Sequence, residues 1–314
     1  MKTYLVTGGA GFIGSHLVEE LVRRGERVRV LDNFLTGKRE NIEPFLSAIE
    51  LIEGDIRDYE TCLRAVDGAD YVLHQAALPS VPRSVEDPQT TDAINIQGTL
   101  NMLLAASRAR AKKFVFASSS SVYGDEEQLP KREGKEGNLL SPYAISKMVG
   151  EKYGWLFNSL YKLPTVSLRY FNIFGSRQDP FSQYAAAVPN FITLVLQGKS
   201  PKIFGDGEQS RDFTYVANVV DANLLAAESG DQASGEAFNI ACAERTTVND
   251  LVAQIKDITG SRVPPVYEPP RPGDIRHSFA DISKAGRLMG YKPKVGFREG
   301  LERTTSWYLE RSRE

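Results

Sequence analysis

The hydrophobic positions of the first 170 residues form short runs that alternate with longer amphipathic stretches. Six runs rich in β-branched and aromatic residues lie at residues 4–7, 28–31, 49–52, 71–74, 114–117 and 166–168. Between most of them, apolar residues recur at helical spacing, for example over residues 12–24 and 94–109. Strands and helices that alternate in this way indicate βαβ units. The pattern therefore predicts an α/β fold built on a Rossmann-type, doubly wound parallel sheet.

After residue 172 the pattern is less regular, because proline and glycine interrupt it repeatedly. We expect this part to form a smaller C-terminal α/β lobe that binds a substrate. Residues 211–228 and 237–240 are predicted to return to the sheet domain. The predicted division is therefore residues 1–171 with about 211–240 in a dinucleotide-binding domain, and about 172–210 and 241–314 in the substrate lobe.

Composition narrows the class of protein. The chain has 314 residues, and its net charge of −2, with 25% charged residues, gives no bulk electrostatic reason to expect a nucleic acid or an acidic membrane as partner. No apolar run approaches 18 residues, and the first strand begins too close to Met1 to leave room for a signal peptide. Cys62 and Cys242 lack metal-ligand spacing and are expected to be reduced thiols. We expect a cytoplasmic protein without a metal site.

A glycine-rich turn follows the first predicted strand. Gly8, Gly11 and Gly14 are spaced as in a dinucleotide-binding turn, and the predicted helix begins at Phe12 and Ile13. In this motif the first glycine permits the tight turn, the second lets the backbone approach a pyrophosphate, and the third allows close packing of helix on strand. The helix N-terminus then faces the phosphates.

Acidic residues follow the next two strands. Asp32, with Asn33 after it, lies 24 residues past Gly8, where a carboxylate accepts hydrogen bonds from both adenosine ribose hydroxyls and repels a 2′-phosphate. NAD is therefore favoured over NADP. Asp55, followed by Ile56, is placed to meet the adenine edge; its alternative role is the N-cap of a helix over residues 59–65, for which Asp58 competes.

Gln75, Ala76 and Ala77 end the fourth strand. The small residues there let a dinucleotide backbone pass at the carboxyl edge of the sheet. His74, just before them, is interpreted as a buried core histidine.

The chemistry is indicated by a tyrosine and a lysine four residues apart. Ser141 and Pro142 are typical of a helix start, so Tyr143 and Lys147 lie on one face of its first turns. An ammonium there lowers the free energy needed to form a phenolate. A lone pair of this kind is more often a surface feature, but a run of serines, residues 118–121, ends the fifth strand. Together these groups predict proton and hydride transfer at an alcohol carbon.

At this point the chain resembles the extended short-chain dehydrogenase/reductase family over essentially its whole length, and within it the UDP-hexose 4-epimerases. The segments that carry the resemblance are residues 7–14, 118–124, 141–147, 168–172, 205–207, 210–213 and 272–274. Residues 74–78, 80–84, 177–180 and 273–278 look most like the UDP-N-acetylglucosamine 4-epimerases of bacterial surface-polysaccharide pathways.

The resemblance implies a role for each residue. Tyr143 is the acid/base at the sugar 4-hydroxyl, Lys147 holds the nicotinamide ribose, and Ser119, with Ser120 beside it, bonds the reacting oxygen. Tyr170 packs by the nicotinamide and Asn95 steadies the cofactor and active site from behind. The residues implied in binding the UDP-sugar are Ser80, Ser119, Tyr143, Asn172, Gln178, Arg211, Arg271, Asp274 and Ser278.

Two positions bear on the sugar. Better-known hexose epimerases of the family carry a lysine just after the fourth strand, where this chain has Pro79. The acetamido-sugar subgroup lacks this lysine too, so Pro79 agrees with that subgroup. Enzymes restricted to plain hexoses place a tyrosine where this chain has Ser278, so the resemblance implies room for an acetamido group. The expected reaction interconverts UDP-N-acetylglucosamine and UDP-N-acetylgalactosamine, and also UDP-glucose and UDP-galactose, through a transient 4-keto sugar on bound NAD.

Other readings stay open. A UDP-uronate 4-epimerase, or a nucleotide-sugar decarboxylase or dehydratase, would use the same fold. Dehydratases of the family usually place Asp-Glu after the catalytic Ser or Thr, where this chain has Ser120 and Ser121. A non-catalytic NAD-binding protein commonly lacks the tyrosine or lysine, and both are present.

A homodimer is also expected. In the resembling family the helices that correspond to residues 94–109 and 143–160 form a four-helix dimer contact. Both carry apolar residues beyond what one sheet face needs, namely Leu100, Leu103, Leu104, Trp155 and Leu156.

Overall fold

A seven-stranded parallel sheet forms the centre of the molecule. The computed structural model describes residues 1–180, 187–270 and 276–312. The sheet order is β11-β6-β5-β4-β1-β2-β3, and every pairing is parallel. Its strands are β1 (Thr3–Thr7), β2 (Arg27–Asp32), β3 (Ile49–Glu53), β4 (Tyr71–His74), β5 (Lys113–Ser119), β6 (Thr165–Tyr170) and β11 (Glu236–Ile240). The predicted Rossmann-type sheet is confirmed, and all six predicted runs are strands in it.

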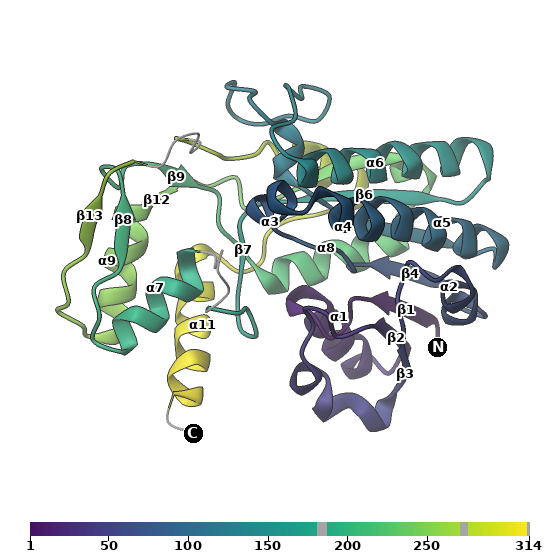
Figure 1. Cartoon of the computed structure of the whole chain (residues 1–314), viewed down its shortest axis with the longest axis horizontal. Coiled ribbons are helices and arrows are strands. Elements are labelled where there is room, and N and C mark those ends of the chain that lie inside the picture. The colour runs from purple at the N-terminus through teal and green to yellow at the C-terminus, as the bar shows by residue number, and fades with distance from the viewer. Residues whose placement is uncertain (181–186, 271–275, 313–314) are drawn as a thin grey trace.

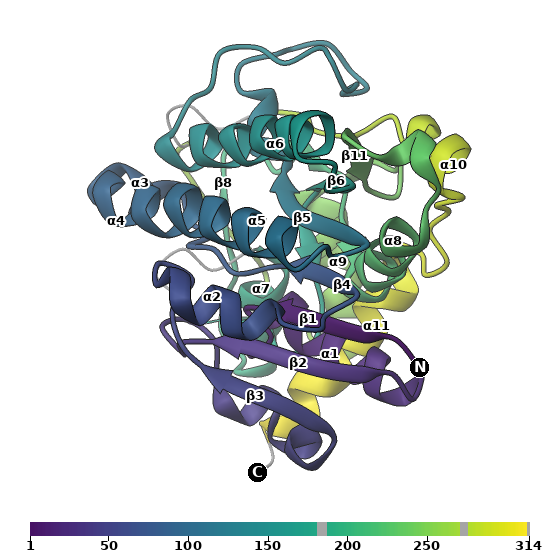
Figure 2. The same cartoon turned by 90° about the vertical axis from the view of Figure 1, so that its right-hand side faces the viewer.

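Helices cover both faces of this sheet (Figure 2). One face packs against α1 (Phe12–Arg23) and α8 (Val216–Glu228), and the other against α2 (Tyr59–Val66), α5 (Thr99–Arg108) and α6 (Pro142–Leu160). The chain leaves β1 toward β2 and β3 on one side, and returns through β4, β5 and β6 on the other. The strand order therefore reverses between β1 and β4, and ligands of such sheets bind at the carboxyl ends of the strands at this point.

The first residues of the helix predicted over 94–109 differ from an ordinary α-helix. After α3 (Val81–Glu86) and α4 (Pro88–Asp92), the chain makes a π-helical turn, Ala93–Gly98, before α5 begins. Such turns are frequent at functional sites. The prediction that Leu103 is surplus to the core is wrong: it is 1% exposed, because α5 packs against α2 as well as the sheet.

A second lobe lies at the other end of the molecule (Figure 1). Its helices are α7 (Ala187–Leu196), α9 (Val248–Thr259) and α11 (Phe297–Arg311), and α10 (Ser283–Met289) packs on β11. Three two-stranded pairs complete it: β7 (Ile173–Phe174) with β10 (Thr214–Tyr215), β9 (Ser210–Arg211) with β12 (Thr246–Thr247), and β8 (Lys202–Phe204) with β13 (Val266–Glu268). This lobe has its own apolar core, which includes Phe174, Phe191 and Leu251. The exact residues that divide the two domains stay a prediction.

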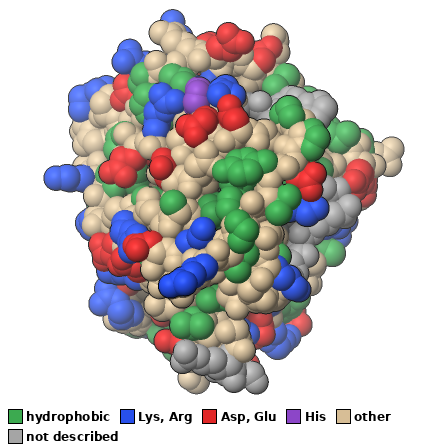
Figure 3. Space-filling model, turned by 90° about the vertical axis from the view of Figure 1, so that its left-hand side faces the viewer, with side chains coloured by type: hydrophobic (Ala, Val, Ile, Leu, Met, Phe, Trp, Pro, Cys, Tyr) green, Lys and Arg blue, Asp and Glu red, His purple; other side chains and the backbone are tan. Residues whose placement is uncertain are grey.

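Figure 3 views the molecule from the side of the second lobe, where apolar side chains form a band among charged ones. Exposed apolar residues of this lobe include Val266 and Tyr267 of β13. Within the described residues, none of the helices combines the length and apolar character that crossing a bilayer requires.

Candidate active site

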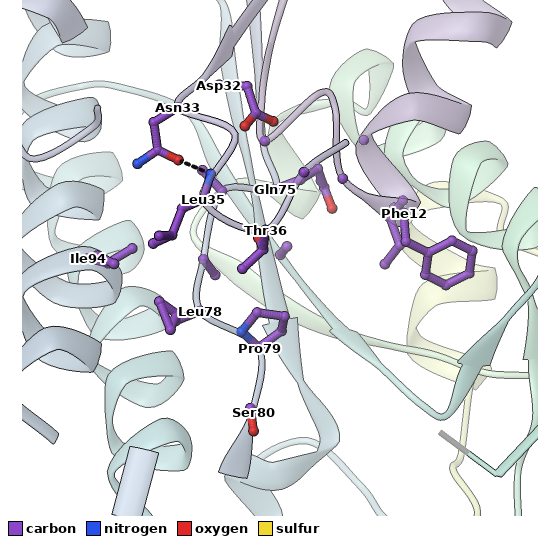
Figure 4. Close-up of a pocket in the computed structure, with 18 of the residues that line it drawn as sticks. Phe12, Asp32, Asn33, Leu35, Thr36, Gln75, Leu78, Pro79, Ser80 and Ile94 are labelled. Atoms are coloured by element: carbon purple, nitrogen blue, oxygen red, sulfur yellow. Dashed lines mark hydrogen bonds between the residues drawn. The ribbon is translucent and has the colours of Figure 1, made fainter. Parts of the chain in front are cut away.

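A cleft of about 920 Å³ opens at the carboxyl ends of the strands, where β1 and β4 part. Figure 4 shows it enclosed by the glycine turn at Phe12, the loop after Asp32 and the segment from Gln75 to Ser80. The cleft brings together nearly all the residues that the sequence assigned to a cofactor. Those in its wall are Gly8, Gly11, Phe12, Ile13, Gly14, Asp32, Asn33, Asp55, Ile56, Gln75, Ala76, Ala77, Tyr143, Lys147 and Tyr170.

The glycine turn leaves no room for side chains. Gly8 has φ +66°, and a Cβ there would lie 2.8 Å from the amide nitrogen of Ala76. A Cβ on Gly14 would lie 2.0 Å from the carbonyl oxygen of Gly8. Gly11 precedes α1 and provides no capping side chain. The first amides of α1 therefore face the cleft without a side-chain acceptor, which suits a diphosphate.

Asp32 ties this turn to the loop after β2. Its Oδ2 accepts from the amide of Ala10 at 2.9 Å and its Oδ1 from the amide of Phe34 at 2.8 Å. Burial raises the pKa of this carboxyl above its usual value, although both hydrogen bonds act against the rise. Each oxygen keeps a further lone pair, so Asp32 has acceptors left for ribose hydroxyls.

The alternative that Asp55 caps a helix is wrong. Asp58 caps α2, since its side chain accepts from the amide of Glu60 at 3.2 Å. Asp55 instead accepts from Asn33 Nδ2 at 2.8 Å and from Arg57 Nη2 at 2.7 Å. The Arg57 guanidinium lowers the pKa of Asp55 to about 2. Asp55 is therefore a charged acceptor in the cleft wall.

The sequence did not point to the loop that follows Asn33. Its residues Leu35, Thr36, Gly37 and Lys38 also line the cleft. Figure 4 shows the Asn33 side chain accepting from the Leu35 amide, at 3.0 Å. The loop has no periodic pattern, so only the neighbouring Asp32 could have indicated it.

Tyr143 and Lys147 face the cleft from the first turns of α6. Ser141 caps this helix as predicted, accepting from the amide of Ala144 at 3.1 Å. Lys147 Nζ donates to the carbonyl oxygen of Ala117 at 2.8 Å and lies 5.8 Å from the centroid of the Tyr143 ring. A positive charge at this distance favours the phenolate.

The two groups differ in how burial affects them. Burial raises the pKa of the Tyr143 hydroxyl, while a hydrogen bond with Ser119 lowers it. Burial lowers the pKa of the Lys147 ammonium to about 7. Burial therefore disfavours the charged form of each group: Tyr143 loses its proton less readily than an exposed tyrosine, and Lys147 loses its proton more readily than an exposed lysine. Perturbed pKa values of this kind are typical of functional sites.

Asn95 and Tyr170 were also predicted to belong to the site, and the structure places them differently. Asn95 does not line the cleft and lies behind its wall. Its side chain accepts from the amide of Leu78 at 2.7 Å and donates to Ser146 Oγ at 3.1 Å, so it links the loop after β4 to α6. Tyr170 lines the cleft and donates to Gln75 Oε1 at 3.1 Å.

Asn223, on α8, was not predicted from the sequence. Its Nδ2 donates to the Tyr170 hydroxyl at 2.8 Å, and its Oδ1 accepts from Gln75 Nε2 at 2.9 Å. No local motif marks this asparagine, because its partners lie 53 and 148 residues away in the chain.

The residues predicted to bind substrate are divided between two hollows. Ser80, Ser119, Asn172 and Gln178 line the large cleft. A second hollow of about 260 Å³ shares Asn172 with it and has Arg211 in its wall. The two hollows are therefore adjacent, and an elongated ligand could extend from one into the other.

Two predicted site residues, Ser120 and Ser278, are not in the wall of the cleft. Ser120 lies in the short helical turn after β5 and does not line it. Ser278 lies beside β9, with its amide donating to the Ser210 carbonyl oxygen at 3.0 Å, and lines neither hollow. Arg271 and Asp274 lie outside the described residues.

The depressed pKa of Lys147 predicts a pH dependence of stability in the cofactor-free protein. The folded state releases the proton near pH 7 and the unfolded chain near 10.5, so the free energy of unfolding rises with pH between these values, by up to about 1.4 kcal/mol per unit. Urea unfolding across this range should show the rise in the wild type and a flatter dependence in Lys147→Met. Parallel curves for the two proteins would contradict the buried ammonium.

Comparison with known proteins agrees with this geometry. The model of the NAD dependent epimerase/dehydratase family matches residues 4–241. A UDP-glucose 4-epimerase of Mycolicibacterium smegmatis is 37% identical, with 99% of this chain and 100% of that protein covered. A UDP-N-acetyl-alpha-D-glucosaminuronate decarboxylase of Bacillus cytotoxicus is 35% identical, with 98% of each covered.

Solved structures show the same spread of substrates. The UDP-N-acetylglucosamine 4-epimerase of Methanobrevibacter ruminantium, in complex with UDP-N-acetylmuramic acid, has 41% identity and a TM-score of 0.94 over 99% of each chain. The UDP-glucose 4-epimerase of Thermotoga maritima with UDP-glucose has 41% identity and a TM-score of 0.93, over 99% of this chain and 100% of that one. A Bacillus cereus UDP-glucuronic acid 4-epimerase with UDP-glucuronic acid and NAD has 33% identity and a TM-score of 0.90, over 99% of each chain.

The family resemblance seen in the sequence is thereby confirmed. A turn without side chains for a dinucleotide, a carboxylate beside it and a tyrosine–lysine pair facing it all occur in a chain that matches the family model over most of its length. The chain belongs to the NAD dependent epimerase/dehydratase family.

Proposed function

We propose that this enzyme is an NAD-dependent 4-epimerase that interconverts UDP-N-acetylglucosamine and UDP-N-acetylgalactosamine, and also UDP-glucose and UDP-galactose. One observation carries the proposal. Tyr143, Lys147 and Ser119 line the same cleft as the glycine turn at Gly8. An alcohol held by the first group of residues would therefore lie beside a dinucleotide held by the second.

The cleft fits NAD because the backbone at Gly8 and Gly14 is free of side chains and Asp32 offers acceptors for ribose hydroxyls. When bound, NAD supplies the hydride acceptor and donor. In the proposed cycle, Tyr143 takes the proton of the sugar 4-hydroxyl as its C4 hydride leaves, and Ser119 hydrogen-bonds the reacting oxygen. The Lys147 ammonium stabilises the phenolate that begins the step.

The resulting 4-keto sugar must then present its opposite face. Hydride returns to C4 from that face and Tyr143 returns the proton to the oxygen, so the configuration inverts without net oxidation. This requires a firm hold on the nucleotide and a loose hold on the sugar. The hollow that contains Arg211, adjacent to the cleft at Asn172, supports the first requirement, since a guanidinium suits a diphosphate.

A UDP-uronate 4-epimerase is the second candidate, because relatives named for uronate substrates are also similar over the whole chain. An assay panel of UDP-glucose, UDP-galactose, their N-acetyl forms and their uronates separates the candidates. A pentose product from UDP-glucuronate would indicate a decarboxylase instead.

Tyr143→Phe should lower turnover by about 10²–10⁴-fold while leaving UDP-sugar binding nearly intact, because only the proton-transfer group is removed. Tyr153→Phe on the same helix is the matched control, since Tyr153 does not line the cleft. Turnover is measured as epimer formation and binding by calorimetry. Near wild-type turnover in Tyr143→Phe would contradict the mechanism.

The choice of sugar is proposed to depend on Ser278. This residue follows the segment that the family uses to hold the nucleotide, and its small side chain leaves volume for an acetamido group. Two amides hold this segment: that of Ser278 donates to the Ser210 carbonyl oxygen, and that of Ala280 donates to the Asp212 carboxylate at 3.2 Å.

Ser278→Tyr should lower activity on the two acetamido sugars by at least about 100-fold, or about 2.7 kcal/mol, and spare the plain hexoses, since steric rejection acts on one substrate class. Ser278→Ala keeps the volume and should retain both activities. Rates of epimerisation for the four sugars decide the matter. If Ser278→Tyr treats both classes as the wild type does, Ser278 does not select the sugar.

We also infer a cytoplasmic homodimer that pairs through α5 and α6. These helices lie side by side in both cartoon views (Figures 1 and 2). The outer surface of α6 keeps large apolar side chains in contact with solvent, notably Trp155, 56% exposed, and Leu160, 67% exposed. Exposed apolar patches of this kind mark protein interfaces.

Sedimentation should show a dimer for the wild type and a larger monomer fraction for Trp155→Glu. The control is Val266→Glu, which places the same charge at an exposed apolar position of the second lobe. A monomeric wild type, or equal effects of the two substitutions, would contradict the α5–α6 interface.

A further inference from the structure

We propose that Glu151, acting through Ser118 and Arg169, is a positioning residue that holds Ser119 and Tyr143 in register for proton transfer. The inference rests on the proposed function, because it assigns these two hydroxyls to the reaction. Glu151 itself does not line the cleft.

The first support is the face of α6 on which Glu151 lies. Tyr143, Lys147 and Glu151 are spaced by four residues and therefore share one face of the helix. Each of them interacts with a different residue at the end of β5. Ser119 lowers the pKa of Tyr143, Lys147 Nζ donates to the carbonyl oxygen of Ala117, and Glu151 Oε1 accepts from Ser118 Oγ at 2.5 Å.

The second support is the register between β5 and β6. Ser118 lies opposite Arg169, and Ser119 lies opposite Tyr170 in the next pair. Glu151 accepts from Arg169 through Nε at 2.8 Å and Nη2 at 2.7 Å, in addition to Ser118. One carboxylate therefore holds both strands at the pair next to Ser119 and Tyr170, and Ser118 itself lines the cleft.

The contact between Glu151 and Arg169 is a buried ion pair. A buried ion pair is weak evidence for stability, because the free energy of desolvating both charges offsets their attraction. Elsewhere in the same interface a neutral bond suffices: Thr165 Oγ1 on β6 donates to the Gly154 carbonyl oxygen of α6 at 2.7 Å. A carboxylate that receives a guanidinium fork and a hydroxyl fixes direction as well as distance. A fixed direction and distance are needed here because Ser119 and Tyr143 must be oriented toward the same reacting oxygen.

Ser118→Ala is a small perturbation that tests the proposal, because it removes one hydroxyl and leaves the Glu151–Arg169 pair in place. Thr165→Val is the matched control, since it removes a buried hydroxyl bond between the same two layers. In Ser118→Ala we expect kcat to fall at least about tenfold with little change in KM, because small misplacements of reacting groups are costly. The acid limb of its kcat–pH profile should move to higher pH, since a weakened Ser119 bond raises the pKa of Tyr143.

Thr165→Val should keep the wild-type kcat and pH profile even if the two variants lose similar amounts of thermal stability. Equal effects of the two substitutions, or a wild-type profile in Ser118→Ala, would overturn the proposal and leave Glu151 a purely structural residue.

A second readout does not depend on turnover. The pKa of Tyr143 can be obtained from tyrosinate absorbance, as the difference between each protein and the same protein carrying Tyr143→Phe. The positioning role predicts a higher Tyr143 pKa in Ser118→Ala than in the wild type or Thr165→Val. If no UDP-sugar were epimerised, the proposed function would fail while this titration would still support or overturn the positioning role.

Discussion

The close approach of α6 to β5 is the constraint on which the site depends. A Cβ on Gly150 would lie 2.2 Å from Cζ of Phe116, so the helix lies nearer to the strand than any larger residue would permit. This distance lets the Lys147 ammonium reach the Ala117 carbonyl and places Tyr143 in the same cleft wall as Ser119, which lowers its pKa. The same proximity removes both groups from water, and this loss of solvation shifts their pKa values in opposite directions.

The two halves of the site are built differently. The cofactor side relies on backbone that is exposed by glycine and held by Asp32, so its shape is fixed by the fold. The substrate side relies on segments that meet between the lobes. Asp212, fully buried beside Arg211, accepts from the amides of Cys242 and Ala280 and thereby joins the end of β11 to the segment after Ser278. A rigid cofactor site and a substrate site assembled from several segments suit one chemistry applied to different sugars, as the named substrates of similar proteins illustrate.

Local signals explain what the sequence could predict. The glycine turn, the Ser141 cap and the tyrosine–lysine spacing depend on neighbours in the chain, and the structure contains each of them. Contacts between distant segments carry no such signal, which is why Asn223 beside Tyr170 and Glu151 beside Arg169 emerged only from the fold. Leu103 was misjudged for the same reason, because its burial depends on α2, another element of the fold.

Deuterium placed at C4 of UDP-N-acetylglucosamine tests the central claim, that C4 is oxidised and reduced again within one binding event. If the hydride leaves C4 and returns to it from the opposite face, the UDP-N-acetylgalactosamine formed in ordinary water retains the label at C4. Magnetic resonance or mass spectrometry of the product reads this directly. Loss of the label to solvent, or accumulation of a 4-keto product, would contradict the account.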